Sequence, residues 1–133
     1  MRAKFAIILI VIFQILSNLV LAQDKPKTAY QNITPEEVKA RLEKGEKLFL
    51  LDVRTPEEYN GPLGHIEGSK LIPLQELDKK YTELDSLKDK EIIVYCRSGN
   101  RSRFASLFLA EKGFKVKNML GGMKAWNRLK EKK

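Results

Sequence analysis

The stretch from Glu91 to Lys112 restricts the fold of this chain more than any other. It begins with the apolar, β-branched run Glu91-Ile-Ile-Val-Tyr95, which is typical of a buried strand. The chain's only cysteine, Cys96, follows this run, and small or polar residues lead on to Ser102. An apolar-periodic segment then continues to Lys112. This order predicts a central strand, a tight loop and a helix, with the cysteine at the rim of the fold.

A cysteine in such a loop is placed to be reactive. Backbone N–H groups of a tight turn and the positive end of the following helix dipole both stabilise a thiolate, the nucleophilic form of cysteine. The other interpretation of a single cysteine is a small apolar residue at the end of a core strand. The residues that follow are poor core residues and favour the reactive interpretation; they are Arg97, Ser98, Gly99, Asn100, Arg101 and Ser102.

Two other segments carry helix-start signals. In Thr34-Pro-Glu-Glu37 and Thr55-Pro-Glu-Glu58, a threonine is followed by proline and, three positions on, by glutamate, which is the pattern of a capping box. Apolar spacing predicts strands over 48–53 and 115–120, and helices over 76–87 and 123–129. Alternating strands and helices predict an α/β fold, with a central, mainly parallel sheet flanked by helices on both faces. The cysteine loop then lies at the carboxyl ends of the strands.

Four segments, in their order along the chain, resemble the signatures of the rhodanese family of sulfurtransferases. They are Leu50-Leu-Asp-Val-Arg-Thr-Pro-Glu-Glu-Tyr59, Gly64-His-Ile-Glu-Gly68, the cysteine loop up to Ser102, and Gly121-Gly-Met-Lys-Ala-Trp126. The resemblance covers about residues 31 to 130 and implies a rhodanese-like fold. One departure is the loop Asn60-Gly-Pro-Leu-Gly64, which is two residues longer than the spacing expected before the family's Gly-His-Ile motif.

The resemblance implies a sulfurtransferase without a cofactor. Cys96 is then the catalytic nucleophile, which takes a sulfane sulfur from thiosulfate or a similar anionic donor and passes it, as a persulfide, to cyanide or a thiol. A thioredoxin-like protein is an alternative acceptor. We expect the loop residues 97–102 to bind the substrate. A guanidinium can bind two oxygens of a sulfonate-like group in parallel, so we assign the donor oxygens to Arg101 and the shape of the rim to Arg97.

We expect three residues to support this loop: Asp52 near the end of the strand predicted over 48–53, and Arg54 and Glu58 after it. We interpret Arg54 and Glu58, four positions apart, as a salt bridge that fixes the corner, and Asp52 as a polar brace. His65, the only histidine, stands where the family has a structural residue, and a thiolate that is already stabilised needs no base. One histidine and one cysteine do not suffice for a metal site, so we predict none. Trp126 is expected in the core.

Two other functions share some of these features. A cysteine phosphatase or arsenate reductase-like enzyme also combines a cysteine, a backbone cradle and an arginine, but the phosphatases have the arginine six positions after the cysteine. Position 102 is Ser, and Arg101 comes one residue too early, so the pocket should be smaller and suit a sulfur atom. The other alternative is a non-catalytic rhodanese-like module that carries sulfur or binds a partner. Such modules often lack the cysteine that this chain has.

The first 22 residues have the pattern of a secretory signal peptide. Arg2 and Lys4 precede an apolar stretch, and Val20-Leu-Ala22 ends the segment with a small residue. An uncleaved membrane anchor is the alternative, but the 18 residues from Phe5 to Ala22 include three polar ones and are short for a span of about 20 apolar residues. We therefore divide the chain into a signal peptide (1–22), a short linker (23–30) and one domain (31–133).

Charge and cysteine content narrow the class of the mature protein. Without Arg2 and Lys4, 23 basic and 17 acidic residues remain, and the net charge of +6 favours anions modestly. The basic residues are interspersed with acidic ones and form no stripe with exposed aromatic residues, so we expect no nucleic-acid binding. A single cysteine makes no internal disulfide. We expect an exported, periplasmic monomer without stable membrane association after cleavage.

We predict that the exported protein begins at Gln23, because the apolar segment is short, interrupted and followed by Val20-Leu-Ala22. N-terminal sequencing of protein recovered from the exported fraction should therefore read from Gln23. Intact Met1-Arg-Ala-Lys4 on membrane-bound protein would show that the segment is an anchor instead.

Overall fold

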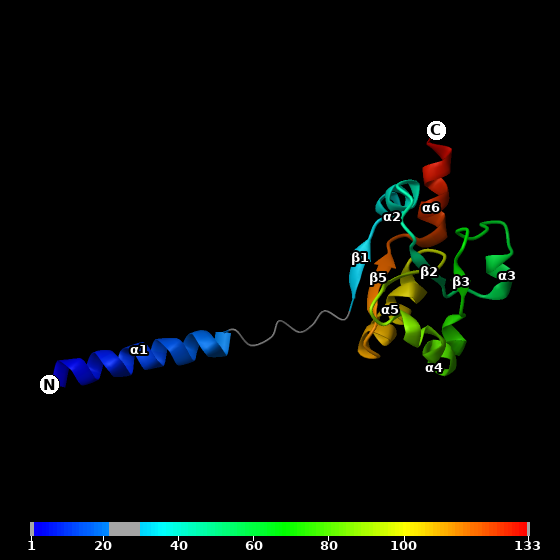
Figure 1. Ribbon diagram of the computed structural model, residues 1–133. Helices are drawn as coiled ribbons and strands as arrows, with labels where there is room; N and C mark the ends of the chain where they lie inside the picture. The colour runs from blue at the N-terminus through cyan, green and yellow to red at the C-terminus, as the bar shows by residue number, and fades with distance from the viewer. Residues whose placement is uncertain (1, 22–29, 133) are drawn as a thin grey trace.

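The computed structural model describes residues 2–21 and 30–132. Five parallel strands form one sheet in the order β1-β5-β4-β2-β3, so β4 is the central strand, as predicted (Figure 1). The strands are β1 (Gln31–Ile33), β2 (Phe49–Asp52), β3 (Lys70–Leu71), β4 (Glu91–Tyr95) and β5 (Lys115–Met119). Asp52 pairs with Tyr95, so β2 and β4 end at the same edge of the sheet. Cys96 follows β4 directly at this edge.

Helices cover both faces of the sheet, which confirms the predicted architecture. They are α2 (Pro35–Glu43), α3 (Pro56–Tyr59), α4 (Leu77–Lys80), α5 (Asn100–Glu111) and α6 (Gly122–Glu131). One apolar core joins one face of the sheet to α4 and α5 and contains Leu77 and Leu109. A second core joins the opposite face to α2 and α6 and contains Val38 and Met123. Cys96 belongs to the first core, so its side chain lies on the α5 side of the sheet.

The two capping boxes form as the sequence predicts. The Thr34 hydroxyl accepts a hydrogen bond from the Glu37 N–H (3.1 Å), and the Glu37 carboxylate accepts one from the Thr34 N–H (2.8 Å). Thr55 and Glu58 repeat this exchange at the start of α3, at 3.2 and 3.1 Å. The second box is important for the site because it fixes the position of the Glu58 carboxylate.

The segment predicted as one helix over 76–87 is not a single α-helix. It consists of a 3₁₀ turn (Leu74–Glu76), the short α4, and a second 3₁₀ segment (Tyr81–Leu87). Tyr81, Leu84 and Leu87 are three positions apart, and a 3₁₀ helix, with three residues per turn, places all three on one face. All three pack in the first core, so the change of helix type follows from their spacing.

The outermost strands, β1 and β3, were not predicted. Each pairs with only one neighbour and has only two or three residues, Gln31–Ile33 and Lys70–Leu71. Edge strands of this kind carry little apolar periodicity, because only part of their surface faces a core. Their pairing is therefore visible only in the assembled sheet.

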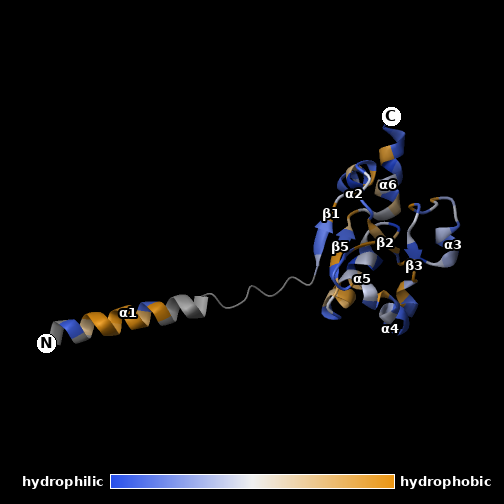
Figure 2. Ribbon diagram, in the orientation of Figure 1, coloured by the Kyte–Doolittle hydropathy of each residue, from blue (hydrophilic) through white to orange (hydrophobic). Residues whose placement is uncertain are grey.

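Helix α1 (Arg2–Leu21) spans the predicted signal segment, and Figure 2 shows its apolar character. The large apolar side chains between Ile7 and Ile15 are exposed. Among the residues that the structure describes, none of the helices combines the length and apolarity needed to cross a membrane. The predicted cleavage position between Ala22 and Gln23 lies outside the described residues, so export stays a prediction.

Candidate active site

Cys96 lies directly after β4, beneath the loop that leads into α5. Its side chain is almost completely buried, with 1% of its surface exposed. The Gly99 N–H donates a hydrogen bond to Cys96 Sγ at 3.1 Å, and the Ser102 hydroxyl lies 3.4 Å from the same sulfur. Gly99 has a φ of 104°, a left-handed conformation that glycine adopts without strain, and α5 begins at the next residue. The loop thus turns its donors toward the sulfur.

Two opposing effects act on the acidity of the thiol. Burial is the largest single effect and by itself would raise the pKa of Cys96. The hydroxyl of Ser102 and the backbone N–H groups of Ser102, Gly99 and Ser98 lower it, and together they outweigh burial. The pKa of Cys96 is therefore below its usual value, which increases the fraction of thiolate near neutral pH.

The amino end of α6 holds the outer side of the cysteine loop. The N–H of Met123 donates to the Cys96 carbonyl at 2.9 Å, and the N–H of Lys124 donates to the Arg97 carbonyl at 3.0 Å. This approach requires glycine at position 122, which has a φ of 55°. A Cβ there would collide with the Cys96 carbonyl oxygen and lie 2.6 Å from the Arg97 carbonyl oxygen. This role was not predicted from the sequence, although Gly121 and Gly122, directly before the helix predicted over 123–129, are a visible signal.

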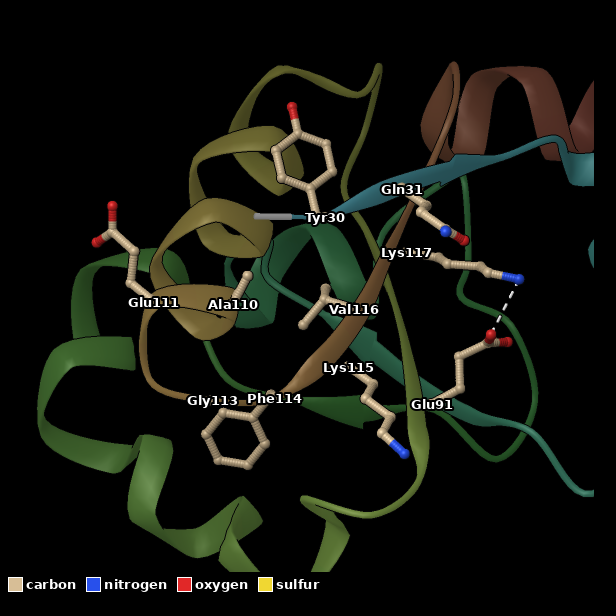
Figure 3. A pocket seen from close by; sticks show the side chains of 10 residues that line it. All are labelled: Tyr30, Gln31, Glu91, Ala110, Glu111, Gly113, Phe114, Lys115, Val116 and Lys117. Carbon is tan, nitrogen blue, oxygen red and sulfur yellow. Dashed lines mark ion pairs between the residues drawn. The ribbon is translucent and has the colours of Figure 1, made fainter. Parts of the chain in front are cut away.

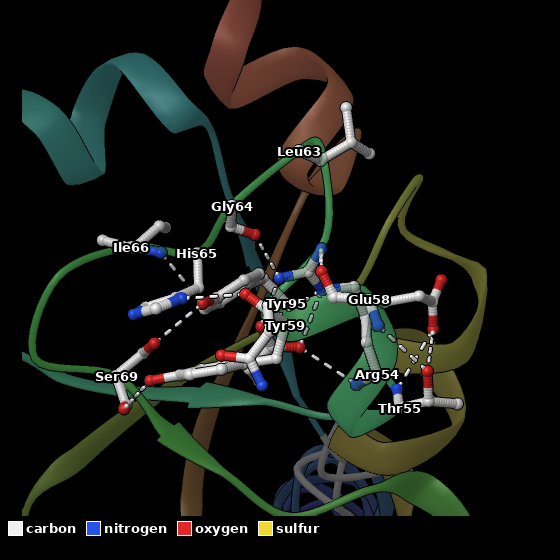
Figure 4. Close-up of polar contacts among 12 residues, drawn as sticks. Arg54, Thr55, Glu58, Tyr59, Leu63, Gly64, His65, Ile66, Ser69 and Tyr95 are labelled. Atoms are coloured by element: carbon white, nitrogen blue, oxygen red, sulfur yellow. Dashed lines mark hydrogen bonds and ion pairs between the residues drawn. The ribbon is translucent and has the colours of Figure 1, made fainter.

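The predicted salt bridge between Arg54 and Glu58 is wrong. Arg54 Nη2 instead pairs with Asp52 Oδ2 at 2.7 Å, and Arg54 Nε donates to Asp52 Oδ1 at 3.0 Å. The remaining guanidinium contacts go to the backbone carbonyls of Glu58 (3.2 Å) and Gly64 (2.7 Å) (Figure 4). The four-residue spacing was misleading because Arg54 precedes the Thr55 cap and is not part of the helix. Asp52 holds the Arg54 guanidinium in place, and its support of the cysteine loop stays a prediction.

The Glu58 side chain pairs with Arg101 instead. Arg101 Nη1 and Nη2 donate to Glu58 Oε2 and Oε1, each at 2.7 Å, which is a bidentate ion pair. The hydrogen bond from Arg101 is the largest influence on the carboxyl group and lowers the pKa of Glu58 to about 2. Glu58 is therefore ionised across the neutral pH range, and it ties α3 to the amino end of α5.

The loop after α3 is anchored by buried polar contacts. The Tyr95 hydroxyl accepts a hydrogen bond from the Ile66 N–H (3.2 Å) and lies 2.8 Å from Ser69 Oγ (Figure 4). The His65 ring stacks on the Tyr59 ring, with the two ring centroids 3.6 Å apart. The Nδ1 atom of His65 is hydrogen-bonded to the Tyr59 carbonyl at 2.9 Å. Both contacts hold the His65 ring against Tyr59 at the end of α3, as a structural histidine would be held.

The predicted binding residues differ in what they offer to a ligand. Gly99 and Ser102 hydrogen-bond the sulfur, and the Ser98 N–H also favours its anionic form. Arg97, Ser98 and Asn100 are exposed to solvent. Arg101 is half-buried against Glu58, so binding of donor oxygens by this arginine stays a prediction. Trp126, expected in the core, is only partly buried and packs against the second core.

A cavity of about 280 Å³ lies beside the loop and is lined by Arg54, Glu58, Pro62, Leu63 and Arg97. Pro62 and Leu63 belong to the loop Asn60-Gly-Pro-Leu-Gly64, so this loop supplies the apolar wall. Asn127 of α6 donates to the Leu63 carbonyl at 3.0 Å and holds that wall in place. The cavity therefore has one apolar side and one charged side.

A larger cavity, of about 700 Å³, lies at the opposite end of the sheet (Figure 3). Its lining includes Glu91 and Lys115, which begin β4 and β5, and Glu111 at the end of α5. Cys96 follows the other end of β4, so this cavity takes no part in cysteine chemistry. Within residues 2–21 and 30–132, no three His, Cys, Asp or Glu side chains are grouped in a way that could hold a metal ion.

Comparison with known proteins defines the family. Residues 34–129, well over half of the chain, match the model of the rhodanese-like domain. The chain belongs to the rhodanese-like domain family. A candidate sulfurtransferase, YtwF of Bacillus subtilis, is 40% identical over 96 residues, which cover 72% of this chain and 89% of YtwF. A sulfurtransferase of Allochromatium vinosum is 35% identical over 97 residues, with coverage of 72% and 87%.

Solved structures agree with this assignment. A rhodanese-like domain protein from Staphylococcus aureus superimposes with a TM-score of 0.64 and is 33% identical. The match covers 72% of this chain and 90% of the other. The rhodanese-like fold predicted from the four sequence segments is therefore confirmed, and the match includes all four of them.

We predict that Cys96 reacts as a thiolate below the pH at which an ordinary thiol ionises. The rate of alkylation by iodoacetamide should have its midpoint below about pH 8.5. Replacing Ser102 by alanine removes a donor to Sγ and should move the midpoint upward. Ser106→Ala is the matched control. Ser106 lies one turn further along α5, and its buried hydroxyl has no hydrogen-bond partner among the described residues. Equal midpoints in the wild type and Ser102→Ala would contradict this assignment.

We predict that Gly122→Ala distorts the cysteine loop. The added Cβ collides with backbone atoms, so the free energy of unfolding should fall by about 1–3 kcal/mol and alkylation of Cys96 should change in rate. Gly45→Ala controls for backbone strain alone, since Gly45 has a φ of 82° and open space around its Cβ position. Thermal unfolding of both variants would measure the difference in stability. An equal loss of stability in both would show that the close approach of Gly122 to the Cys96 and Arg97 carbonyls has no special role.

Proposed function

We propose that this chain is a sulfurtransferase that moves a sulfane sulfur from thiosulfate, or a similar anionic donor, to cyanide or a thiol acceptor. The set of hydrogen-bond donors around Cys96 Sγ carries this proposal, because it favours a thiolate without a neighbouring base. Relatives named as sulfurtransferases support the same class of reaction.

In the first half-reaction, the Cys96 thiolate attacks the sulfane sulfur of thiosulfate. A new S–S bond forms while the S–S bond of the donor breaks, and sulfite leaves with the bonding electron pair. The product is a persulfide anion, so the negative charge moves from Sγ to the outer sulfur and no outside oxidant or reductant is consumed. The N–H and hydroxyl donors of Gly99 and Ser102 are aimed at the region in which this charge changes position.

In the second half-reaction, the acceptor attacks the outer sulfur of the persulfide. Cyanide becomes thiocyanate, and the electron pair of the broken S–S bond returns to Cys96 as a thiolate. A thiolate acceptor takes the sulfur in the same way and becomes a persulfide itself. A thioredoxin-like protein would present such a thiol, and the exposed outer side of the loop leaves room for an acceptor.

The place of the reaction is also part of the proposal. The first 22 residues support export, and the mature chain from Gln23 would then work as a periplasmic monomer. A phosphatase is less well supported, because Ser102 occupies the position of the phosphatase arginine and brings no positive charge to that position.

We predict that thiosulfate adds the mass of one sulfur atom to the mature protein and that cyanide removes it with release of thiocyanate. Intact-mass spectrometry before and after each reagent measures both steps. Cys96→Ser should abolish transfer with little change in thermal stability, because a hydroxyl fits the same site but is a far weaker nucleophile.

The same preparation separates the alternatives. Repeated turnover with thiosulfate and cyanide identifies an enzyme, whereas a single load of sulfur without turnover identifies a carrier. Aryl phosphate hydrolysis should be undetectable. Transfer that survives Cys96→Ser, or phosphatase activity that depends on Cys96, would contradict the proposed function.

A further inference from the structure

Three arginines lie on or beside the cysteine loop: Arg97 and Arg101 belong to its sequence, and Arg54 lines the same cavity as Arg97. Two of the three are already engaged. Arg54 is 1% exposed and is bound to the Asp52 carboxylate and two backbone carbonyls. Arg101 directs both terminal nitrogens at Glu58, each at 2.7 Å. A bidentate guanidinium–carboxylate pair uses the same fork of donors that would bind two oxygens of a sulfonate-like group.

Glu58 is held in place independently of Arg101. Its Oε2 accepts hydrogen bonds from the Thr55 N–H (3.1 Å) and the Thr55 hydroxyl (3.2 Å), which belong to the capping box of α3. A donor anion that approaches Arg101 must therefore compete with a carboxylate that is fixed and already ionised. The pair is only about one-third exposed, so the competing interaction is not fully screened by water.

Arg97 is in a different position. It is exposed and lines the cavity of about 280 Å³. In the part of the chain that the structure describes, its guanidinium makes no ion pair or side-chain hydrogen bond. The Arg54–Asp52 and Arg101–Glu58 pairs are each neutral overall, so Arg97 is the one positive charge among these three arginines that no carboxylate neutralises.

We infer that Glu58 is a specificity-determining residue: it withholds Arg101 from anionic sulfur compounds, so that their selection rests on Arg97. This inference rests on the proposed function and deepens it, because it revises which arginine meets the donor. The site attracts small anions through the positive charge of Arg97 at the cavity. If Arg101 were released from Glu58, its guanidinium would add a second positive group that can bind two oxygens of the anion at once. Glu58 thereby weakens the binding of a doubly charged anionic donor such as thiosulfate, and also of the anionic product that must leave.

A pair of alkylating reagents tests this without any need for sulfur transfer. Iodoacetate and iodoacetamide are of similar size and both react at Cys96, but only iodoacetate is charged, so the ratio of their rates reports the electrostatics of the approach to the sulfur. Glu58→Gln keeps a capping-box residue and should raise this ratio about fivefold, whereas Arg97→Gln should lower it by a similar factor.

Matched variants control for the overall charge of the protein. Glu57→Gln removes a carboxylate from the same helix, and Arg103→Gln removes an exposed guanidinium from α5; neither residue lines the cavity, and both should leave the ratio unchanged. The gain from Glu58→Gln should be larger when Arg101 is present than in an Arg101→Gln background. An equal gain in both backgrounds would show that Glu58 acts only through its own charge and would overturn the inference.

Steady-state kinetics then connect the ratio to the donor. In Glu58→Gln the KM for thiosulfate should fall while the rate of the cyanide step is retained, and in Arg97→Gln that KM should rise. An unchanged or higher KM in Glu58→Gln, with normal thermal unfolding, would mean that Glu58 only positions the loop. If Glu58→Gln does not fold, an unchanged rate ratio in Arg97→Gln still refutes the inference. Failure of the wild type to form a persulfide would refute the proposed function but leave the alkylation ratios as a test.

Discussion

The structure depends on how one short stretch of backbone divides its hydrogen bonds. The N–H groups of the loop after β4 point inward to Cys96 Sγ, while the carbonyls of Cys96 and Arg97 point outward to the first N–H groups of α6. Each peptide group of a tight loop must find a partner once it leaves water. Here the two sets of partners also determine the chemistry, because the donors that satisfy the sulfur favour its anionic form.

Local signals in the sequence were sufficient for much of this arrangement. The capping boxes at Thr34 and Thr55, the run that forms β4 and the loop that follows it depend on neighbouring residues, and the structure has them as predicted. The α/β architecture followed from the alternation of such segments. What could not be predicted depends on which segments meet in space: the short edge strands β1 and β3, and the docking of α6 on the cysteine loop.

The arginines show this limit most clearly. Spacing along the chain suggested that Arg54 binds Glu58, but the folded chain exchanges the partners: Arg54 turns back to Asp52, and Glu58 meets Arg101, 43 positions away. A buried guanidinium needs a charge partner and carbonyls for its remaining donors, and the end of β2 and the loop at Gly64 provide both. The corner beside the cysteine loop is therefore stabilised by contacts that no single segment encodes.

The burial of Cys96 also affects how long the thiol survives. The chain has no second cysteine, so a sulfenic acid formed on Cys96 has no thiol within the same molecule with which to condense. With 1% of the residue exposed, very little of Cys96 is open to peroxides in solution. Protection from irreversible oxidation is thus a matter of restricted access, and the rigidity that α6 gives the loop contributes to the working lifetime of the protein as well as to its reactivity.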